Sequence, residues 1–373
     1  MIKKKQIFIS LGSNQGDRLV YLIKALCLLE AHEIKVIGLS RVYETSPWGF
    51  ESTPFYNACA QLHTDVSPQE LMQILLKVEK HLGRTRTENT GYAARSIDLD
   101  LLCFEEVILN SDILTLPHPR LELRNFVLQP LEEISKEWIH PVLNKTVSEL
   151  REQSSDTAVC KPFPFSFWSP PIFKTYAYIA IEGNIGIGKS TLAQQIKEQY
   201  SVELHSERFT NNPYLPLFYK DPQKYALEVE TFFLNDRVEQ MVQFWKEEKA
   251  SVVSDYFIYK SLVFAAQNLT SLDFKSYEKQ FSSLVTKLNA PSLLVYLQAD
   301  VSHLMRQIQK RGRPFEQEIK EDYLRKIDQG YENLMQTNFS FPVVKIEVDE
   351  LNFEADTTAF QSILRKIYAT TFL

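Results

Sequence analysis

Long apolar runs and closely spaced cysteines are both missing from this sequence of 373 residues. No stretch approaches the ~18–20 apolar residues that cross a bilayer, so the sequence predicts no membrane span. The apolar run behind the basic residues 3–5 stops at Leu11, which argues against a secretion signal. The cysteines are scattered, without metal-like or redox spacing, at Cys27, Cys59, Cys103 and Cys160. We therefore expect a cytoplasmic protein with reduced thiols.

An excess of basic charge is missing as well, because 41 Lys and Arg against 47 Asp and Glu give a net charge of −6. No stripe of basic residues runs along the chain, so neither nucleic acid nor a membrane is an expected partner. Phosphorylated small molecules remain candidate ligands, since a local cluster of cations suffices for them. The length predicts two domains, each large enough for its own core.

Glycine is scarce, with 11 residues, yet it gathers at Gly183, Gly186 and Gly188. The spacing Gly-x4-Gly-Lys-Ser lies between a predicted strand, 178–181, and a predicted helix, 190–200, as a phosphate-binding loop requires. Glycine lets successive backbone N–H groups turn toward phosphate oxygens. An ordinary glycine-rich turn is the alternative interpretation.

The residues after these glycines have the chemistry that a nucleotide site needs. Lys189 can neutralise the β- and γ-phosphates of ATP, and the Ser190 hydroxyl can ligate Mg²⁺. Thr191 follows at the start of the predicted helix. Such a loop usually opens its domain, so its place in mid-chain indicates that another complete domain precedes it.

The predicted elements differ between the two halves of the chain. The first half shows strand, helix, two strands, helix and strand, at 6–12, 18–31, 34–43, 57–66, 68–82 and 97–104, followed by an irregular, proline-punctuated tail. This order predicts a ferredoxin-like α+β sandwich. In the second half strands alternate with helices, which predicts an α/β domain with a doubly wound parallel sheet that carries the phosphate-binding loop, or P-loop. We expect domains at 1–152 and 174–373.

A connector rich in proline and aromatic residues separates these domains at 153–173. Its prolines prevent a continuous helix and favour an extended, semi-rigid segment. Phe163, Phe165, Phe167 and Trp168 are too apolar for a free linker. We expect them to pack on one or both domains.

Two acidic residues in the first half suggest a metal site. Strict alternation places Asp98 and Asp100 on one face of a strand, with Cα atoms ~6.6 Å apart. Neighbouring carboxylates repel each other unless a cation lies between them, so the pair suits Mg²⁺ ions that carry substrate phosphates. Arg84, Arg86 and Arg95 surround the loop that leads into this strand and could clamp a polyphosphate. A solvated polar face of an edge strand is the alternative.

Further segments join these residues in resembling one family. They are Gly12-Ser13-Asn14, residues 43–47, residues 55–58, Glu79 with Gly83-Arg84-x-Arg86, residues 95–100, Pro117-His118-Pro119-Arg120 and Arg124-Asn125-Phe126. Over about residues 5–152 the chain resembles hydroxymethyldihydropterin pyrophosphokinase of folate synthesis. The resemblance implies a ferredoxin-like fold and transfer of pyrophosphate from ATP to the hydroxymethyl group of a dihydropterin.

The resemblance also implies roles for individual residues. Two Mg²⁺ ions would bind Asp98 and Asp100, and Arg84 and Arg95 would act on the transferring group. The implied ATP-binding residues are Glu79, Arg86, His118 and Arg124. The pterin would be held by Thr45, Phe55, Asn57 and Phe126, with the two rings stacking on it and Asn57 bonding its edge.

The second half carries three more signals. Glu207 follows a predicted strand, from which a carboxylate can face the γ-phosphate and take a hydroxyl proton; a surface glutamate is the alternative. Arg311 and Arg313 surround Gly312 and look like a lid over ATP, although a basic helix end gives the same pattern. Glu230 lies in a helix with an aromatic stripe that is mostly core.

With Asn212-Pro213-Tyr214-Leu215 and Phe232-Phe233-Leu234-Asn235-x-Arg237, these signals resemble the deoxynucleoside kinases over about residues 175–371. The resemblance implies transfer of the γ-phosphate of ATP to a 5′-hydroxyl. It also implies Glu207 as general base, Lys189 on phosphate, Ser190 on one Mg²⁺, and Arg311 and Arg313 as the lid.

Two departures from that family concern the nucleoside. Glu230 stands where relatives carry a glutamine that reads the base. Asp255-Tyr256-Phe257 stands where relatives carry Asp-Arg-Ser, so an arginine is missing from its expected place beside the 5′-hydroxyl. An ionised glutamate accepts but does not donate hydrogen bonds, which suits the amino group of adenine better than the carbonyl of guanine.

The sequence thus predicts a bifunctional ATP-dependent enzyme whose partners are ATP, a dihydropterin and a deoxynucleoside, with deoxyadenosine favoured. A homodimer through the kinase domain is left open. Two alternatives remain: that one domain, the kinase half first, is a non-catalytic scaffold, and that the phosphate loop drives work on nucleic acid.

Overall fold

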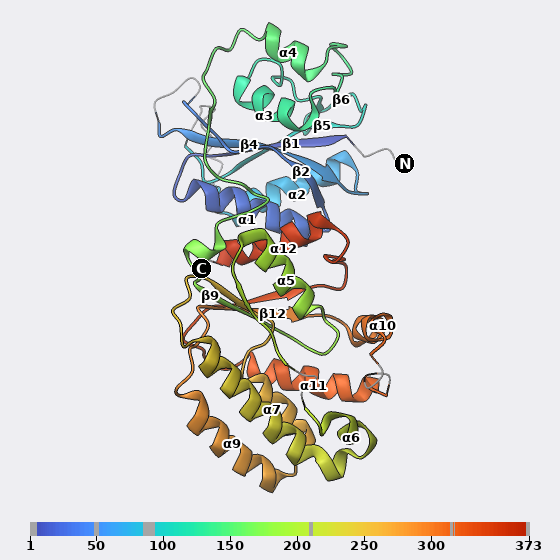
Figure 1. The fold of residues 1–373 in the computed structure, drawn as a ribbon. Helices are drawn as coiled ribbons and strands as arrows, with labels where there is room; N and C mark the ends of the chain where they lie inside the picture. Colours follow the sequence, from blue (N-terminus) through green and yellow to red (C-terminus); the bar gives the residue numbers. More distant parts are fainter. Residues whose placement is uncertain are drawn as a thin grey trace. The chain divides into compact units, whose positions relative to one another are not determined.

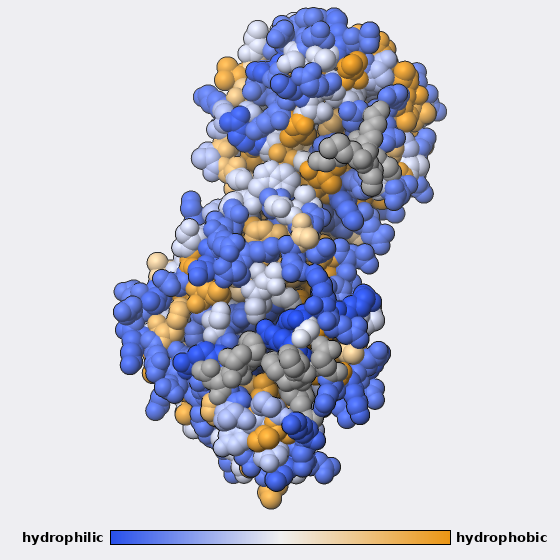
Figure 2. Space-filling view, turned by 45° about the vertical axis from the view of Figure 1, so that its right-hand side comes forward, coloured by the Kyte–Doolittle hydropathy of each residue, from blue (hydrophilic) through white to orange (hydrophobic). Residues whose placement is uncertain are grey.

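The computed structural model describes residues 6–47, 52–84, 94–208, 212–313, 316 and 318–370. Two compact units make up the chain: unit 1 contains residues 1–170 and 364–373, and unit 2 contains residues 171–363. The surface drawn in Figure 2 is largely hydrophilic, with hydrophobic residues in small groups between polar ones. Among the described residues, none of the helices has the length and apolar character to span a bilayer.

Unit 1 is built on an antiparallel sheet with the strand order β5-β1-β4-β3-β8, and β2 also pairs with β4. Its strands are β1 (Ile7–Ser13), β2 (Lys35–Leu39), β3 (Tyr43–Thr45), β4 (Phe55–His63), β5 (Asp98–Phe104) and β8 (Lys161–Pro162). The small hairpin β6 (Leu109–Asn110) and β7 (Thr115–Leu116) follows β5. Figure 1 shows α1 (Arg18–Ala31) and α2 (Pro68–His81) on one face of this sheet, and α3 (Asn125–Ser135) and α4 (Val147–Gln153) on the other.

The two helices α1 and α2 begin where the sequence predicts. The Asp17 carboxylate accepts a hydrogen bond from the backbone N–H of Val20, 3.3 Å away. Ser67 and Glu70 form a reciprocal capping box, with Pro68 in the first turn. These caps satisfy N–H groups that the helix itself leaves without partners.

The structure of unit 1 corrects the sequence prediction at two places and adds detail at a third. The predicted strand 34–43 is two strands, β2 and β3, and the register of β2 on β4 shifts between Val36 and Gly38. The tail expected to be irregular contains α3, which includes Pro130, and α4. Part of the predicted linker is β8, which pairs with β3 and extends the sheet.

The aromatic residues of that linker pack as predicted. The rings of Phe163 and Tyr56 lie 4.5 Å apart, centroid to centroid. The backbone N–H of Phe163 donates to the carbonyl of Val42, and Phe167 is only 1% exposed. This stretch is therefore part of unit 1 rather than a free tether.

Unit 2 contains a five-stranded parallel sheet in the order β10-β11-β9-β12-β13, which confirms the predicted doubly wound sheet. The strands are β9 (Tyr178–Glu182), β10 (Glu203–His205), β11 (Val252–Ser254), β12 (Leu293–Gln298) and β13 (Val343–Glu347). The helices are η1 (Ile172–Lys174), α5 (Lys189–Tyr200), α6 (Leu215–Lys220), α7 (Pro222–Phe244), α8 (Lys260–Asn268), α9 (Ser271–Val285), α10 (Val301–Arg311) and α11 (Glu321–Leu334). The last helix, α12 (Thr357–Ala369), begins in unit 2, and its residues from Leu364 on belong to unit 1. Figure 1 shows α5 on one face of the sheet and α7, α9 and α11 on the other.

The topology of unit 2 gathers its chemistry at one edge. The central strand β9 leads into the glycine loop, and β10 and β11 end at the same edge because the strands are parallel. Ligands of such sheets bind outside the carboxyl ends of the strands. The residues that follow these three strands are therefore the expected ligand-binding residues of unit 2.

Candidate active sites

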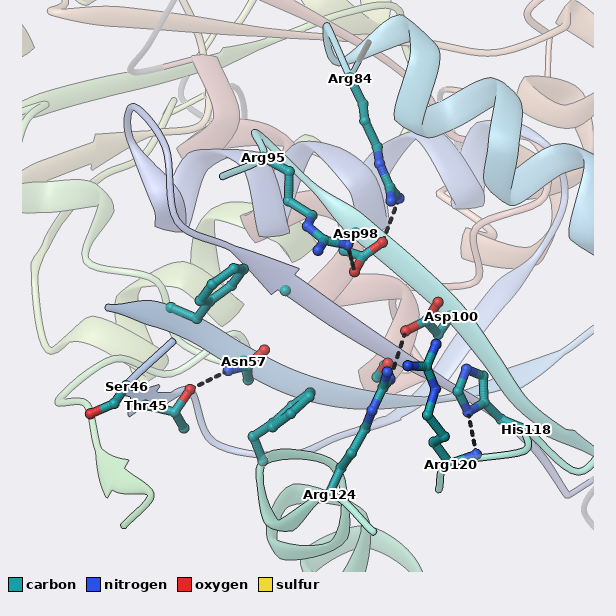
Figure 3. Close-up of a pocket in the computed structure, with 14 residues that line it drawn as sticks. Thr45, Ser46, Asn57, Arg84, Arg95, Asp98, Asp100, His118, Arg120 and Arg124 are labelled. Carbon is teal, nitrogen blue, oxygen red and sulfur yellow. Dashed lines mark hydrogen bonds and ion pairs between the residues drawn. The ribbon is translucent and has the colours of Figure 1, made fainter. Parts of the chain in front are cut away.

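Unit 1 has a hollow where β1, β4 and β5 lie side by side (Figure 3). The strand register places Gly12 of β1 between Asn57 of β4 and Asp98 of β5. The predicted residues that line this hollow are Thr45, Phe55, Asn57, Arg84, Arg95, Asp98, Asp100, His118, Arg124 and Phe126. The hollow also includes Ser10, Gly12, Ser46 and Arg120, to which the sequence assigned no role.

Acidic and basic side chains alternate at the β5 side of this hollow (Figure 3). Arg84 and Arg95 each bond one oxygen of the Asp98 carboxylate, the second through Nη1 at 2.5 Å. The guanidinium of Arg124 lies 3.7 Å from the Asp100 carboxylate. Burial, and then repulsion by Asp98, raises the pKa of Asp100 to about 6.

The acidic pair fits Mg²⁺ but does not enclose it. Mg²⁺ in nucleotide sites takes one or two carboxylates and completes its shell with water and phosphate oxygens. Asp98 and Asp100 supply such a pair, and their mutual repulsion is the cost that a cation would remove. Within the described parts of the chain, no three His, Cys, Asp or Glu side chains form a group that could hold a metal ion by themselves.

His118 lines the hollow next to these carboxylates. Its Nδ1 accepts a hydrogen bond from the backbone N–H of Arg120, 3.2 Å away, so the neutral ring carries its proton on Nε2. Burial, with Arg124 and Arg120 nearby, lowers the pKa of His118 to about 4. The imidazole is therefore a neutral hydrogen-bond donor at physiological pH.

The other end of the hollow suits a flat, polar ring. Asn57 donates through Nδ2 to the Thr45 hydroxyl, 2.7 Å away, which fixes the direction of the amide. A Cβ on Gly12 would lie 2.9 Å from the Asn57 carbonyl oxygen, so glycine is needed for this close approach. Phe55 and Phe126 are half-buried and line the same hollow.

Two predicted ATP-binding residues stand apart from the lining set. Glu79 is only 2% exposed and accepts hydrogen bonds from the Arg84 guanidinium and from the backbone N–H of Leu99. It therefore positions Arg84 without lining the hollow itself. Arg86 lies outside the described residues.

In unit 2 the glycine loop has the backbone that the sequence predicts. Gly183, Gly186 and Gly188 have φ of +150°, +83° and +96°. A Cβ on Gly188 would lie 2.7 Å from the ring of Phe353. The Lys189 ammonium donates to the carbonyls of Gly183 and Asn184 at 2.7 and 2.8 Å, and burial lowers its pKa to about 8.

Asp255, the residue after β11, is hydrogen-bonded both to the glycine loop and to the segment after β10. Ser190 donates to one oxygen of Asp255 at 2.7 Å, and the other oxygen accepts the backbone N–H of Glu207 at 2.9 Å. Asp255 thus links the hydroxyl predicted to bind Mg²⁺ with the carboxylate predicted to act as base. The sequence analysis named Asp255 only within a segment that differs from the deoxynucleoside kinase pattern and gave it no role. An acidic residue directly after a strand that ends beside the glycine loop was the signal that could have identified it.

Glu207 is held by two cations inside the hollow of unit 2. Arg237 donates through Nε to one carboxylate oxygen, and Lys260 donates to the other, both at 2.8 Å. Burial raises the pKa of Glu207, but Lys260 and Arg237 more than offset this effect and leave the pKa well below its usual range. Lys260 therefore supplies a cation beside Glu207, where the sequence analysis expected an arginine to be missing.

Two further groups line the same hollow. Arg311 and Arg313 both bond the carboxylate of Glu316, so the predicted lid arginines are held together at the end of α10. Glu230 of α7 is 3% exposed and accepts a hydrogen bond from the Asn268 amide. Arg237, Lys260 and Asn268 were missed as site residues. Arg237 ends a motif that the sequence analysis quoted, which was the available signal, whereas Lys260 and Asn268 are brought to the site only by the packing of α8.

Two hollows with cations placed for a polyphosphate, on two different folds, define an ATP-dependent phosphotransferase with two sites. Residues 8–136 match the family model of 7,8-dihydro-6-hydroxymethylpterin-pyrophosphokinase, and residues 179–373 match that of deoxynucleoside kinase. The chain belongs to both families and is a fusion of their two domains.

Known relatives cover the two halves separately. A deoxyguanosine kinase of Bacillus subtilis is 32% identical over 196 residues, 51% of this chain and 95% of that protein. A 2-amino-4-hydroxy-6-hydroxymethyldihydropteridine pyrophosphokinase of Aquifex aeolicus is 37% identical over 158 residues, 42% of this chain and 94% of that protein. The folic acid synthesis protein fol1 of Pneumocystis carinii is 36% identical over 179 residues, 47% of this chain but only 24% of that longer protein. A solved deoxyadenosine kinase from M. mycoides is 26% identical, with a TM-score of 0.44 over 50% of this chain and 95% of that one.

Proposed function

We propose that the chain catalyses two separate transfers from ATP. Unit 1 transfers pyrophosphate to the hydroxymethyl group of 6-hydroxymethyl-7,8-dihydropterin, and unit 2 transfers the γ-phosphate to the 5′-hydroxyl of a purine deoxynucleoside. The observation that carries the first activity is that one hollow joins an oriented amide and two half-buried rings to the Asp98–Asp100 pair with its arginines. The observation that carries the second is the Glu207 cluster beside the glycine loop.

In unit 1 the pterin hydroxyl attacks the β-phosphorus of ATP and AMP leaves. Asp98 and Asp100 would hold two Mg²⁺ ions, which supply charge neutralisation when bound. Arg84 and Arg95 already lie against Asp98, from where their guanidinium groups can exchange to phosphate oxygens. The neutral His118 donates a hydrogen bond to the same polyphosphate without adding charge.

In unit 2 the 5′-hydroxyl attacks the γ-phosphorus, ADP leaves, and the hydroxyl proton passes by way of Glu207 to solvent. Glu207 is ionised and accepts the hydrogen bond of the attacking hydroxyl, which orients it for attack. Lys189, Arg311 and Arg313 neutralise the transferring group. Ser190 and Asp255 would hold one Mg²⁺, since they already share a hydrogen bond at 2.7 Å.

The nature of the leaving nucleotide tests both activities at once. The whole chain, given ATP with the dihydropterin, is expected to release AMP; given ATP with a deoxynucleoside, it is expected to release ADP. Asp98→Ala should abolish only the first reaction and Lys189→Ala only the second. If neither ADP nor a nucleoside monophosphate forms with any of the four deoxynucleosides, the kinase proposal is wrong.

A non-catalytic kinase half is the second candidate. It was suggested by the altered Asp255-Tyr256-Phe257 segment, but the cation that this segment lacks is provided from α8 by Lys260. Glu207 therefore has a cation on each carboxylate oxygen, Arg237 on one and Lys260 on the other, which favours catalysis over a scaffold role.

A further inference from the structure

Only one of the two carboxyl oxygens of the buried Glu230 is hydrogen-bonded to a described residue. Oε1 accepts a hydrogen bond from Nδ2 of Asn268 at 2.7 Å. Oε2 is shielded from solvent and has no hydrogen-bond partner among the residues that the structure describes. Both side chains line the hollow of unit 2. A buried polar atom without a partner is costly, so Oε2 is expected to be satisfied by a ligand in this hollow.

Charged groups around Glu230 are already committed to one another. Arg237, on the same helix, and Lys260, on α8, donate to the Glu207 carboxylate. From α9, the Tyr277 hydroxyl donates to the backbone carbonyl of Glu230 and not to its carboxyl group. Within the described parts of the chain, the side chain of Glu230 accepts its one hydrogen bond from the neutral Asn268 amide. Burial therefore dominates and raises the pKa of Glu230 to about 7; the Asn268 bond, Arg237 and Lys260 oppose this rise, and Glu207 adds to it.

The two forms of the carboxyl group present different hydrogen-bond patterns. A neutral acid offers one donor and one acceptor, whereas a carboxylate offers acceptors only. Adenine presents an amino donor next to a ring nitrogen that accepts, so it pairs with the neutral acid. Guanine presents a ring N–H next to an amino group, two donors, so it pairs with the carboxylate. Cytosine has the same donor–acceptor pair as adenine.

We propose that Glu230 selects the base through its own protonation: the neutral acid binds adenine and the carboxylate binds guanine, so one site changes its preference with pH. This inference rests on the proposed deoxynucleoside kinase activity of unit 2. It differs from a fixed preference for adenine, because the ionised form alone would leave the adenine ring nitrogen facing another acceptor.

The test is the ratio of kcat/KM for deoxyadenosine to that for deoxyguanosine, measured on the whole chain from about pH 6 to about pH 8.5. If each base binds one form only, the ratio falls by up to about tenfold per pH unit. Glu230→Gln keeps a donor and an acceptor but does not titrate, so it should favour deoxyadenosine with a flat profile. Glu228→Gln makes the same change at an exposed position of the same helix and should leave the wild-type profile unchanged.

Calorimetry supplies a second readout that a purely structural role would not move. Deoxyadenosine binding at about pH 8 should take up close to one proton, seen as a dependence of the binding heat on the buffer, and Glu230→Gln should remove this uptake. Turnover of both purines with a pH-independent ratio would overturn the inference while leaving the kinase activity intact. Absence of turnover with every deoxynucleoside would overturn both. If only one purine is turned over, its own profile decides: kcat/KM for deoxyadenosine must fall, or for deoxyguanosine rise, through about pH 7.

Discussion

Replacing Lys260 by methionine removes one of the two cations that hold Glu207. The ammonium lies 2.8 Å from the Glu207 carboxylate, and the two side chains are 8% and 15% exposed, so solvent screens the pair weakly. A hydrogen bond to a charged group contributes about 1.5–3 kcal/mol, and Arg237 keeps the other oxygen in place. We therefore expect kcat/KM for the deoxynucleoside to fall roughly 10- to 100-fold at neutral pH.

The pH profile separates this effect from a general loss of structure. In the native chain the two cations keep Glu207 ionised, so its activity should show no loss from this group down to about pH 5. In Lys260→Met, one of the two cations bonded to Glu207 is lost, so burial is offset less and the pKa of Glu207 rises. Because the role proposed for Glu207 needs its carboxylate form, activity should then be lost as pH falls, along an acidic limb that the native chain lacks.

The assay is ADP release with a saturating concentration of ATP. AMP release with the dihydropterin controls for the amount of protein and for the folding of unit 1, and a thermal melt of each variant controls for the folding of unit 2. Lys260→Arg keeps the positive charge and should show no acidic limb even if its rate is reduced. If Lys260→Met and the native chain have superimposable pH profiles, Lys260 does not act through Glu207 and the reasoning is refuted.

Three further predictions concern stability and the loop. Gly188→Ala, with φ of +96° and a Cβ 2.7 Å from Phe353, should raise KM for ATP by about tenfold or more in the nucleoside reaction, and unchanged ATP kinetics would contradict this. Glu230→Gln should stabilise the chain to urea by about 3 kcal/mol at about pH 8 but not at about pH 4, because the pKa of Glu230, raised from 4.5 to about 7, makes ionisation cost stability as pH rises through this window. Phe163→Ala should lower the unfolding free energy of unit 1 by about 2 kcal/mol through loss of its contact with Tyr56, whereas Pro164→Ala, exposed beside it, should not.

Local signals predicted the parts of the fold that local chemistry determines. The caps at Asp17 and Ser67 mark helix starts, and alternation in β5 places Asp98 and Asp100 on the side of the hollow. The split of residues 34–43 depends on the shifted register of β2 against β4, which is a long-range pairing. Helix α3 was missed because Pro130 lies inside it and Arg124 provides no side-chain cap. The capping box at Thr146 and Glu149 was a readable signal for α4.

In the candidate sites, too, residues with partners nearby in sequence could be predicted, and residues with long-range partners could not. The place of Lys189 was predictable, since its partners Gly183 and Asn184 belong to the same loop. Asn57 was named only through the family resemblance, because its partner Thr45 lies on another strand. Lys260 and Asn268 were not predictable, because their roles arise only when α8 packs beside α7 and the end of β10. A lysine at the start of a helix carries no sign in the sequence that it will be 6% exposed and paired.

Glu207 and Glu230 show how one hollow can keep two carboxyl groups in different states. Glu207 receives hydrogen bonds from two cations and stays ionised, whereas Glu230 receives one from a neutral amide and has a pKa near neutrality. Environments that push two pKa values apart assign distinct roles to chemically identical groups. The ionised carboxyl group is suited to orient a hydroxyl for attack, and the one that can be neutral is suited to read a base. Because Arg237 and Lys260 are bound to Glu207, removing either cation should also change the charge around Glu230, so activity and base preference are expected to shift together in Lys260→Met.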